Sequence, residues 1–388
     1  MLRHVTRLAA GAVMTATLAT AALAEDTFKV GYIGGFTGWM AFYDGAQLEG
    51  VKLAIDQMNK AGGIDGKMQI ELITRDMRSE PPEATVMAQE LLAAGVHVVI
   101  SPCDGDPTIA TGQVFAAASI PVISSCNTAP TTPMLGGPNV FISYAADNVQ
   151  GTVLAQFAQK SGFKTALTLA SKDNVYTDKL PVYFAKAFAA LGGKILGNIE
   201  FKIGQPDFNA EVTKIKAMDP QPEVIMTSAF EPEFPVFIKA LRAAGLKTPV
   251  LETDGIDSPT TYALGDVVEG VIMTNAGFPT PGSALEKFNA DYKAMYNQDS
   301  QTVYNANGYN IMQVFQAAVK ATGGNLDGAG LTAAIDSLEG LDTITGKLTY
   351  KGMSRVPLVN VAVNKITGGK KVHVEDVTPD PAMIPKPE

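Results

Sequence analysis

Short β-branched runs alternate with helical segments along most of this chain, and this alternation restricts the possible folds more than any other feature. One series extends from Phe28 to Tyr144, and a second begins at Thr165 and reaches Glu252. Regular alternation favours parallel sheets that helices cover on both faces. Two successive series in a chain of 388 residues, too long for one compact domain, predict an α/β protein with two Rossmann-like lobes.

The stretch from Val98 to Pro130 is the clearest part of the first series, because it contains two similar strand ends. Val99–Cys103 and Val122–Cys126 are both β-branched runs that finish in small polar residues and a cysteine, and the alanine-rich segment Thr108–Ala118 between them predicts a helix. Such a unit makes neighbouring parallel strands whose carboxyl ends lie side by side. Ligands bind at that edge of an open α/β sheet, so we expect the ligand site here.

The first 24 residues have the features of a secretory signal peptide. Arg3 and Arg7 precede an apolar run from residue 8 to residue 23, which ends in Ala22-Leu23-Ala24. A membrane anchor is the alternative, but threonines interrupt the run and it is barely long enough to span a bilayer. We therefore expect cleavage before Glu25 and export of the remaining chain to the periplasm.

The net charge argues against several classes of partner. The chain carries 30 Lys and Arg against 39 Asp and Glu, which gives a formal charge of −9. An acidic chain without a basic stripe is a poor candidate for binding nucleic acid or an anionic membrane surface. No later segment is long and apolar enough to cross a bilayer, so we expect the exported protein to be soluble.

The only two cysteines, Cys103 and Cys126, stand at the two similar strand ends. Equivalent ends of neighbouring parallel strands lie about 5 Å apart, a separation that a disulfide tolerates. In an oxidising compartment a bridge is therefore one interpretation. Two buried thiols that pack as small hydrophobic side chains are the other.

Known catalytic and cofactor-binding patterns are absent from the sequence. Gly62–Lys67 and Gly340–Lys347 resemble phosphate-binding loops, but they have the wrong length and lack the following Ser or Thr, which indicates turns. His97 and His373 lie far apart, and Asp104-Gly105-Asp106 falls short of a calcium loop. We therefore expect no metal, no cofactor and no enzymatic activity.

The end of the chain departs from the alternation. Helices are predicted at about 283–296, 302–321 and 331–338, and hairpin-like strands at 347–350, 359–363 and 372–374. Residues 379–388 are proline-rich and are expected to form an unpacked tail.

Several phrases of the sequence are similar to one family. They are GYIGGFTGWMAFYDGAQLEGVKLAIDQMNKAGGIDGKMQIEL near the start, PVISSCNTAP at the second strand end, FPVFIKALRAAGLKTPVLETDG, and the late NANGYNIMQVFQAAV. Together with the leader they resemble the substrate-binding proteins of branched-chain amino-acid ABC transporters, from about Thr27 to the terminal hairpin. The resemblance implies the type I periplasmic binding fold, in which two lobes joined by three hinge crossovers close on a ligand.

The resemblance also implies where the chain passes between the lobes. Crossovers are expected near 143–147, 274–278 and 345–350. The N-terminal lobe would comprise residues 25–145 and 276–346, and the C-terminal lobe residues 146–275 and 347–378, followed by the tail.

Residues that match ligand-binding positions of the family are expected to form a site between the lobes. Thr128 and the backbone near Cys126 would hold a carboxylate, with Gly105 in place of the family's usual serine and Asp106 beside it. Asp254 matches the acid that takes the ammonium group, which is chemically sensible because a buried zwitterion needs a partner at each end. The aromatic side chains expected to shield the ligand are Trp39, Tyr43, Tyr176 and Phe230, with Glu231 as the alternative to Phe230.

Three acids depart from the family's pattern. Asp104, Asp106 and Glu231 add negative charge close to the expected carboxylate end, where they would repel a ligand carboxylate. This charge disfavours plain leucine, isoleucine or valine. It leaves a polar amino acid, an amide, a urea-like compound or an amine.

The leading hypothesis is an exported, monomeric receptor that binds a small polar solute, an amino acid or a relative, and delivers it to the membrane subunits of an ABC permease. The same fold could instead feed a signalling receptor. A different class, an exported hydrolase or lyase, would need a convergent base and nucleophile, and Asp106 with Thr128 is the best pair available.

Overall fold

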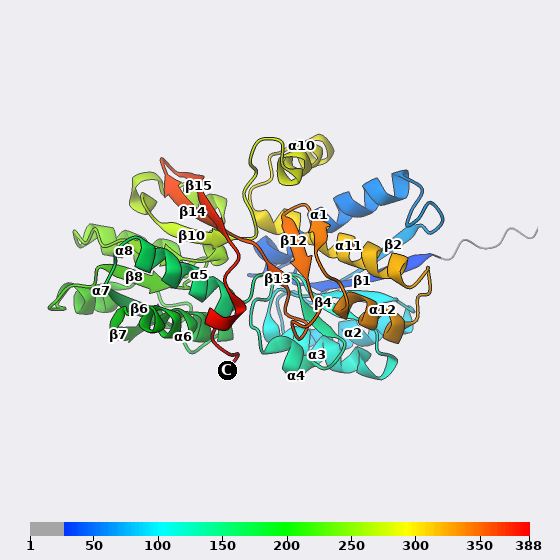
Figure 1. The fold of residues 1–388 in the computed structure, drawn as a ribbon, viewed down its shortest axis with the longest axis horizontal. Helices are drawn as coiled ribbons and strands as arrows, with labels where there is room; N and C mark the ends of the chain where they lie inside the picture. Colours follow the sequence, from blue (N-terminus) through cyan, green and yellow to red (C-terminus); the bar gives the residue numbers. More distant parts are fainter. Residues whose placement is uncertain (1–26) are drawn as a thin grey trace, which may run out of the picture.

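Two α/β lobes lie side by side in the computed structural model, which describes residues 27–388 (Figure 1). Each lobe is built on one large sheet, and helices pack against the sheets. The prediction of an α/β fold with two Rossmann-like lobes is confirmed. The predicted signal peptide, residues 1–24, lies outside the described residues. Within the described chain, no helix is both long enough and apolar enough to span a membrane.

The first lobe contains a five-stranded parallel sheet in the order β2-β1-β3-β4-β5. Val99 pairs with Val122 in this sheet, so the two similar strand ends lie side by side as predicted. The strands are β1 (Phe28–Gly34), β2 (Ile70–Asp76), β3 (Val98–Ser101), β4 (Val122–Ser124) and β5 (Val140–Ile142). The helices are α1 (Ala41–Lys60), α2 (Glu83–Ala93), α3 (Gly105–Phe115) with the short turn η1 (Ala116–Ala118), α4 (Thr132–Gly136), α10 (Ala284–Tyr296), α11 (Val303–Ala321) and α12 (Gly328–Asp336).

Helix α11 returns from a distant part of the sequence and packs on α1 (Figure 1). Two glycines make this close packing possible. A Cβ on Gly50 would lie 1.7 Å from the carbonyl oxygen of Asn305, and a Cβ on Gly308 would lie 2.1 Å from that of Gln47. The backbones of α1 and α11 are therefore in direct contact, and the first turns of both helices belong to the same lobe.

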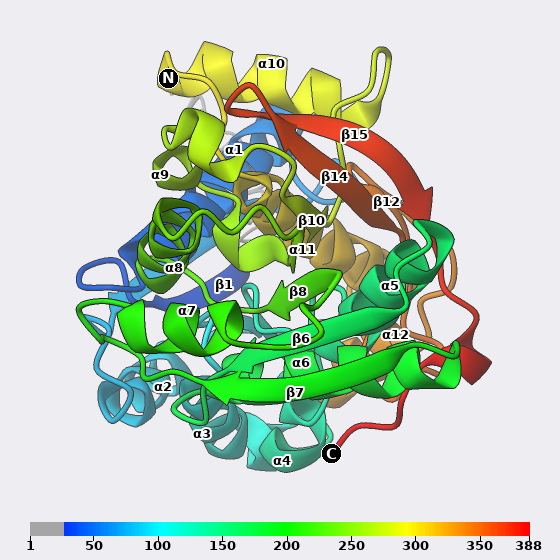
Figure 2. The same cartoon turned by 90° about the vertical axis from the view of Figure 1, so that its left-hand side faces the viewer.

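The second lobe contains a seven-stranded sheet in the order β15-β14-β10-β9-β8-β6-β7, and it faces the viewer in Figure 2. Its strands are parallel except for the terminal hairpin β14–β15, which adds antiparallel to β10. The strands are β6 (Thr165–Ala170), β7 (Lys194–Glu200), β8 (Val224–Thr227), β9 (Val250–Glu252), β10 (Ile272–Asn275), β14 (Val361–Thr367) and β15 (Lys370–Val377). The helices are α5 (Asp147–Lys160), α6 (Val175–Ala190), α7 (Asn209–Lys216), α8 (Glu233–Ala243) and α9 (Pro259–Tyr262), with the short turns η2 (Asp254–Ile256), η3 (Gly265–Val268) and η4 (Pro381–Met383).

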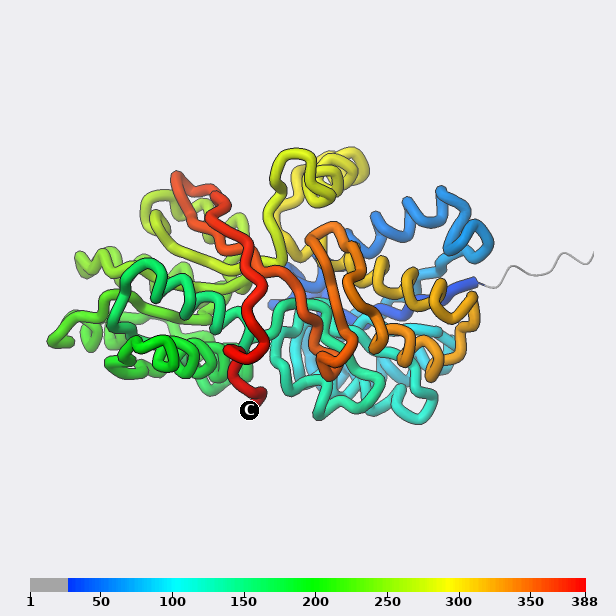
Figure 3. The backbone as a smooth tube through the Cα atoms, in the orientation of Figure 1, coloured from blue at the N-terminus to red at the C-terminus, as the bar shows by residue number. Residues whose placement is uncertain are grey.

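The chain passes between the lobes three times, and the third passage differs from the prediction (Figure 3). A small sheet of β11 (Leu341–Thr343), β12 (Gly346–Thr349) and β13 (Leu358–Val359) precedes this passage. It belongs to the first lobe, because Leu348 and Tyr350 are buried in that core and Tyr350 Oη donates to Ile142 O at 2.7 Å. The assignment of residues 347–359 to the C-terminal lobe is therefore wrong, and the chain changes lobe at Asn360.

The segment predicted to be an unpacked tail, residues 379–388, packs against the second lobe (Figure 3). Asn148 Nδ2 donates to Pro385 O at 2.8 Å, and Glu388 N donates to Tyr183 Oη at 2.9 Å. The prediction is wrong because polar groups of α5 and α6 fasten this segment through its backbone, which proline content does not reveal.

Candidate functional site

A cleft lies between the lobes, where most of its lining residues follow the carboxyl ends of β3, β4, β6, β8 and β9. Open α/β sheets bind ligands at these strand ends. The cavity volume of the cleft is about 80 Å³, which suits a small solute. The lining residues are Trp39, Met40, Tyr43, Cys103, Asp104, Cys126, Asn127, Thr128, Asn174, Tyr176, Phe230, Asp254, Gly255 and Tyr304.

Most of the site residues predicted from the sequence line this cleft, and two do not. Gly105 and Asp106 form the first turn of α3, which begins at Gly105 instead of Thr108 because Asp104 caps it, accepting a hydrogen bond from Gly105 N at 2.7 Å. Asp106 is exposed, so its assignment and that of Gly105 are corrected. Thr128 lines the cleft and Asp106 does not, so the cleft does not contain the pair considered for hydrolysis. The predicted residues that do line the cleft are Trp39, Tyr43, Cys126, Thr128, Tyr176, Phe230 and Asp254.

Glu231, the alternative to Phe230, also lies outside the cleft lining. Its carboxylate accepts hydrogen bonds from the hydroxyls of Ser258 and Thr261, where α9 begins. Phe230 instead stacks on Trp39 of the other lobe, with ring centroids 6.4 Å apart and an interplanar angle of 22°. The aromatic side chain, and not the acid, therefore reaches the cleft.

The cleft residues of the strand ends β3 and β4 form what we call the first-lobe wall: Cys103, Asp104, Cys126, Asn127 and Thr128. Cys103 and Cys126 are joined by a disulfide, with 4.5 Å between their Cα atoms. The structure thus contains the first of the two alternatives for the cysteines. The bridge fastens the ends of two neighbouring strands to each other.

A buried acid, Asp44, supports the first-lobe wall from behind. Its carboxylate accepts hydrogen bonds from Gly35 N at 2.8 Å, Cys103 N at 2.9 Å and Ser125 Oγ at 2.8 Å. Burial raises the pKa of Asp44 to about 7, and these three donors oppose the rise. Sequence reasoning missed Asp44, although an acid in the first turn of the helix beside Tyr43 was a signal.

The cleft residues of the other lobe form what we call the second-lobe wall: Asn174, Tyr176, Phe230, Asp254 and Gly255. Asn174 caps α6 by accepting from Tyr176 N at 2.9 Å, which fixes the start of that helix at the cleft. The Tyr176 hydroxyl is hydrogen-bonded to the Thr253 hydroxyl and accepts from Gly255 N at 3.2 Å. The tyrosine therefore holds the loop that carries Asp254.

Asp254 is the acid of the second-lobe wall. It is 3% exposed, and within residues 27–388 its Oδ1 atom has no hydrogen-bond partner. Its Oδ2 atom accepts from Tyr304 Oη at 3.0 Å, and the same hydroxyl lies 2.9 Å from Asp254 O. Burial raises the pKa of Asp254 to about 6.

Tyr304 is a cleft residue that sequence reasoning missed. It lies in the first turn of α11, so it belongs to the first lobe while its hydroxyl reaches Asp254 of the second. Its ring meets that of Tyr43 edge-on, with centroids 5.4 Å apart. The only signal was its place just before the late phrase that begins at Asn305.

Two further acids of the second lobe are buried near Asp254. Asp147 and Glu252 are both 0% exposed. Both oxygens of Asp147 and the Oε1 atom of Glu252 lack a hydrogen-bond partner in the described chain. Burial first, and repulsion by Asp254 in addition, raise the pKa of both carboxyl groups well above their usual values.

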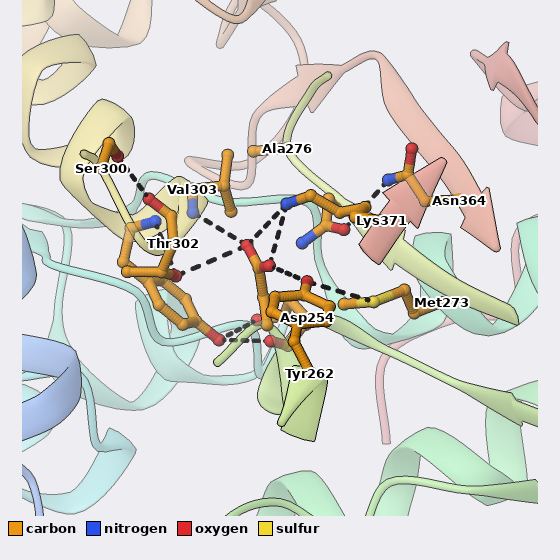
Figure 4. A network of polar contacts seen from close by, with 12 residues as sticks. Asp254, Tyr262, Met273, Ala276, Ser300, Thr302, Val303, Asn364 and Lys371 are labelled. Carbon is orange, nitrogen blue, oxygen red and sulfur yellow. Dashed lines mark hydrogen bonds and ion pairs between the residues drawn. The ribbon is translucent and has the colours of Figure 1, made fainter. Parts of the chain in front are cut away.

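A polar network beside the cleft connects the lobes through the carboxylate of Asp257, three positions after Asp254. Figure 4 labels its partners Tyr262, Val303 and Lys371. Lys371 Nζ lies 2.9 and 3.0 Å from the two carboxylate oxygens of Asp257, and Tyr262 Oη also donates to this carboxylate. Val303 N, at the start of α11 in the first lobe, donates to Asp257 Oδ2 at 2.8 Å. The carboxylate thereby binds the amino-terminal end of a helix that belongs to the other lobe.

In the part of the chain that the structure describes, no group of three or more His, Cys, Asp or Glu residues could hold a metal ion. The acids of the cleft, Asp104 and Asp254, stand on opposite lobes.

A comparison with protein families finds that the family model described as "Periplasmic binding protein" matches residues 27–370. The Leu/Ile/Val-binding protein homolog 1 of Brucella abortus (strain 2308) is 30% identical over 356 residues, which cover 90% of this chain and 94% of that protein.

Solved structures share the fold of this chain. The branched-chain amino-acid transporter substrate-binding protein LivJ of Streptococcus pneumoniae, in complex with isoleucine, has a TM-score of 0.81 at 24% identity, covering 91% of this chain and 100% of that one. A solute-binding protein of an ABC transporter from Rhodopseudomonas palustris, in complex with 3,4-dihydroxybenzoic acid, has a TM-score of 0.81 at 24% identity, covering 92% and 99%. At this level of identity the two structures establish the fold alone, and the ligands in them differ in charge.

Proposed function

Because this chain belongs to the periplasmic binding protein family, we propose that it is the solute-binding subunit of an ABC importer and binds an amino acid or a close relative between its lobes. The relative from Brucella abortus is named as a Leu/Ile/Val-binding protein homolog, and the structure from Streptococcus pneumoniae holds isoleucine. In this role the protein works as a monomer outside the cytoplasm and delivers its ligand to the membrane subunits of a permease.

The unpaired oxygen of Asp254 is the observation that carries the proposal. A buried carboxylate oxygen without a partner is unfavourable. A ligand ammonium group would supply the missing donor in a charge-assisted hydrogen bond. The rings of Tyr43, Tyr176 and Tyr304 line the same cleft and would shield that contact from water.

The first-lobe wall suits the other end of such a ligand. Thr128 and Asn127 are buried and line the cleft with groups that can donate and accept hydrogen bonds. The carbonyl of Thr128 accepts from Asp147 N at 2.8 Å, where the chain enters α5 of the second lobe. A ligand bound to Thr128 would therefore contact a residue that is hydrogen-bonded to the first crossover.

Contacts across the cleft support a hinge mechanism. Tyr43 Oη donates to Gly255 O at 3.3 Å, and Trp39 stacks on Phe230, so both lobes meet around the cleft. A ligand stabilises such a closed form only through contacts that the open form lacks. A solute held between Thr128 and Asp254 would contact both lobes and meet this requirement.

The hydrolase alternative is not favoured, because its best catalytic pair included Asp106, which is exposed and outside the cleft. A turnover assay on every solute that binds provides the check. Conversion of a bound amino acid or amide by the pure protein would contradict the assignment as a receptor.

A thermal-shift screen of residues 25–388 against amino acids, amides, ureas, polyamines and aromatic acids tests the proposal. A ligand at one hundred times its Kd stabilises the folded state by about 2.7 kcal/mol, which raises the melting temperature. We expect at least one amino acid or relative to do so, and Asp254→Ala to weaken its binding about 100-fold. Asp106→Ala is the matched control and should bind as the wild type does. Stabilisation by aromatic acids alone, or equal affinity in Asp254→Ala, would contradict the proposal.

A further inference from the structure

The charged side chains that line the cleft are all acidic. Asp104 contributes one carboxyl group on the first-lobe wall, and Asp254 contributes another on the second-lobe wall. Among the described residues of the lining there is no Lys, Arg or His. A zwitterion would bring a carboxylate of its own to this acidic lining, together with its single positive charge.

Two further carboxyl groups of the second lobe lie behind the cleft surface. Asp147 and Glu252 are fully buried, have unpaired oxygens in the described chain, and lie close enough to Asp254 to be repelled by it. Lys371, the cation of the neighbouring network, is already bound to both oxygens of Asp257 (Figure 4). Burial disfavours the ionised forms of these three carboxyl groups by raising their pKa values, and a positive charge in the cleft would favour those forms.

The first-lobe wall is unsuited to a ligand carboxylate for the same reason. Asp104 caps α3 with one oxygen, accepting from Gly105 N, and its side chain still lines the cleft. A ligand carboxylate bound by Thr128 and Asn127 would share the cleft with that group. Two carboxylates in a site of low dielectric constant repel each other, so an uncharged polar group is favoured there.

The aromatic side chains also favour a cation. Tyr43 and Tyr304 meet edge-on near Asp254, and Tyr176 lies beside Phe230 with ring centroids 6.2 Å apart. The faces of such rings carry partial negative charge and attract ammonium groups within about 6 Å. Rings and carboxylates together would bind a cation from several sides.

We propose that the ligand of this cleft carries a net positive charge, with its ammonium group against Asp254 and an uncharged polar group, instead of a carboxylate, beside Asp104. The inference rests on the proposed function and narrows its class of solutes to amino-acid amides and related amines.

Three ligands that share one side chain test the inference by isothermal titration calorimetry at pH 7. Leucine has a net charge of zero, leucinamide is a cation, and N-acetylleucine is an anion; the set is repeated with the side chain of the strongest amino-acid hit from the screen. We expect the amide to bind at least tenfold more tightly than the amino acid, and the N-acetyl derivative to show no binding.

Two variants test whether the charge of Asp104 causes the preference for the amide over the amino acid. Asp104→Asn keeps the helix cap, because Asn is as good a cap as Asp, while it removes the charge. We expect it to reduce the preference for the amide at least fivefold, mainly by improved binding of the zwitterion. Asp106→Asn, in the same turn of α3 but exposed, should leave the preference unchanged.

The outcomes separate the two proposals. If leucine and its analogues bind as tightly as their amides in the wild type, the inference is overturned and the proposed function stands. If Asp104→Asn leaves the preference for the amide unchanged, Asp104 does not set it, and the inference is likewise overturned. If only anions such as 3,4-dihydroxybenzoate bind, both the inference and the proposed amino-acid-like ligand are wrong.

Discussion

The two walls of the cleft use buried acids in opposite ways. Behind the first-lobe wall, Asp44 receives hydrogen bonds from Gly35, Cys103 and Ser125, and a disulfide fastens the same strand ends. On the second-lobe wall, Asp254 keeps one oxygen unpaired within the described chain. The hydrogen bonds of Asp44 are complete without a ligand, whereas Asp254 keeps an oxygen free for the donor that we propose a ligand supplies.

Because of this difference, we expect substitution of Asp44 to lower the stability of the fold and substitution of Asp254 to weaken ligand binding. Removing a satisfied buried acid leaves its donors without partners and destabilises the fold. Removing the Asp254 side chain costs the unliganded fold little, because the Tyr304 hydroxyl keeps its hydrogen bond to the backbone carbonyl of residue 254 and a buried acid disappears. The two lobes should therefore respond oppositely to the same kind of substitution.

The largest effect is expected for Asp44→Ala, which leaves two backbone N–H groups and one hydroxyl without their hydrogen-bond acceptor. We expect the free energy of unfolding to fall by about 4 kcal/mol, since each buried donor without a partner costs about 1 to 3 kcal/mol. Urea denaturation of the unliganded protein measures the change. Asp254→Ala is the matched variant and should unfold at the same or a higher urea concentration. Equal losses in the two variants would refute the distinction between the walls.

The disulfide tests the same wall by another route. Cys103→Ala with Cys126→Ala opens a loop with a sequence separation of 23 residues. A loop of this size predicts a loss of about 3 kcal/mol in the free energy of unfolding. Denaturation of the wild type under reducing conditions is the control and should approach the double variant. An unchanged midpoint in the double variant would show that Asp44 alone fastens the strand ends.

The pH dependence of stability probes the second-lobe wall. Burial raises the pKa of Asp254 to about 6 in the folded chain, above its usual value of about 4 in the unfolded chain. The folded state therefore binds more protons between these values, and the stability that this group contributes, complete below about pH 4, is lost as the pH rises through about 6.

Asp254→Asn cannot titrate at this position and should lose less stability over that range. We expect the wild type to lose about 2 kcal/mol more than the variant between pH 4 and pH 7, measured by denaturation in the absence of ligand. Parallel curves for the wild type and Asp254→Asn would mean that this carboxyl group titrates normally.

The smallest effect is expected where the walls are joined at a distance from the ligand. Val303→Pro removes the N–H that donates to Asp257, and proline suits this first position of a helix, since the preceding residue, Thr302, is already extended. We expect about fivefold weaker ligand binding through faster dissociation, measured by stopped-flow. Val303→Ala keeps the N–H and loses the same packing, so it is the control. Equal rates in the two variants would exclude a role for this hydrogen bond in closure.

The sequence predicted those parts of the site that lie at the ends of strands. Alternating segments located both lobes, and Thr128, Tyr176 and Asp254 all lie in or next to loops that follow strands and line the cleft as expected. Such residues are predictable because strand order and chain direction decide which loops meet at the sheet edge.

The remaining features depend on contacts between distant segments. Tyr304 reaches the cleft because α11 packs on α1, which local sequence does not encode. Asp104 lines the cleft and Asp106 does not, because α3 begins between them, at Gly105. Sequence patterns do not locate this difference, since helix boundaries shift with a single cap. Tyr350 belongs to the first lobe because it is buried in that core and donates to Ile142 O, contacts that no periodic pattern reveals.

The direct contact of α1 with α11 also governs the order in which this protein can assemble. Gly50 and its partner Asn305 are separated by more than half of the chain, and the second lobe likewise receives its last strands, β14 and β15, from the final residues. Neither lobe can finish folding from an N-terminal fragment, although domains usually fold as they emerge. The cleft therefore cannot be complete until α11, which carries Tyr304, has packed on α1.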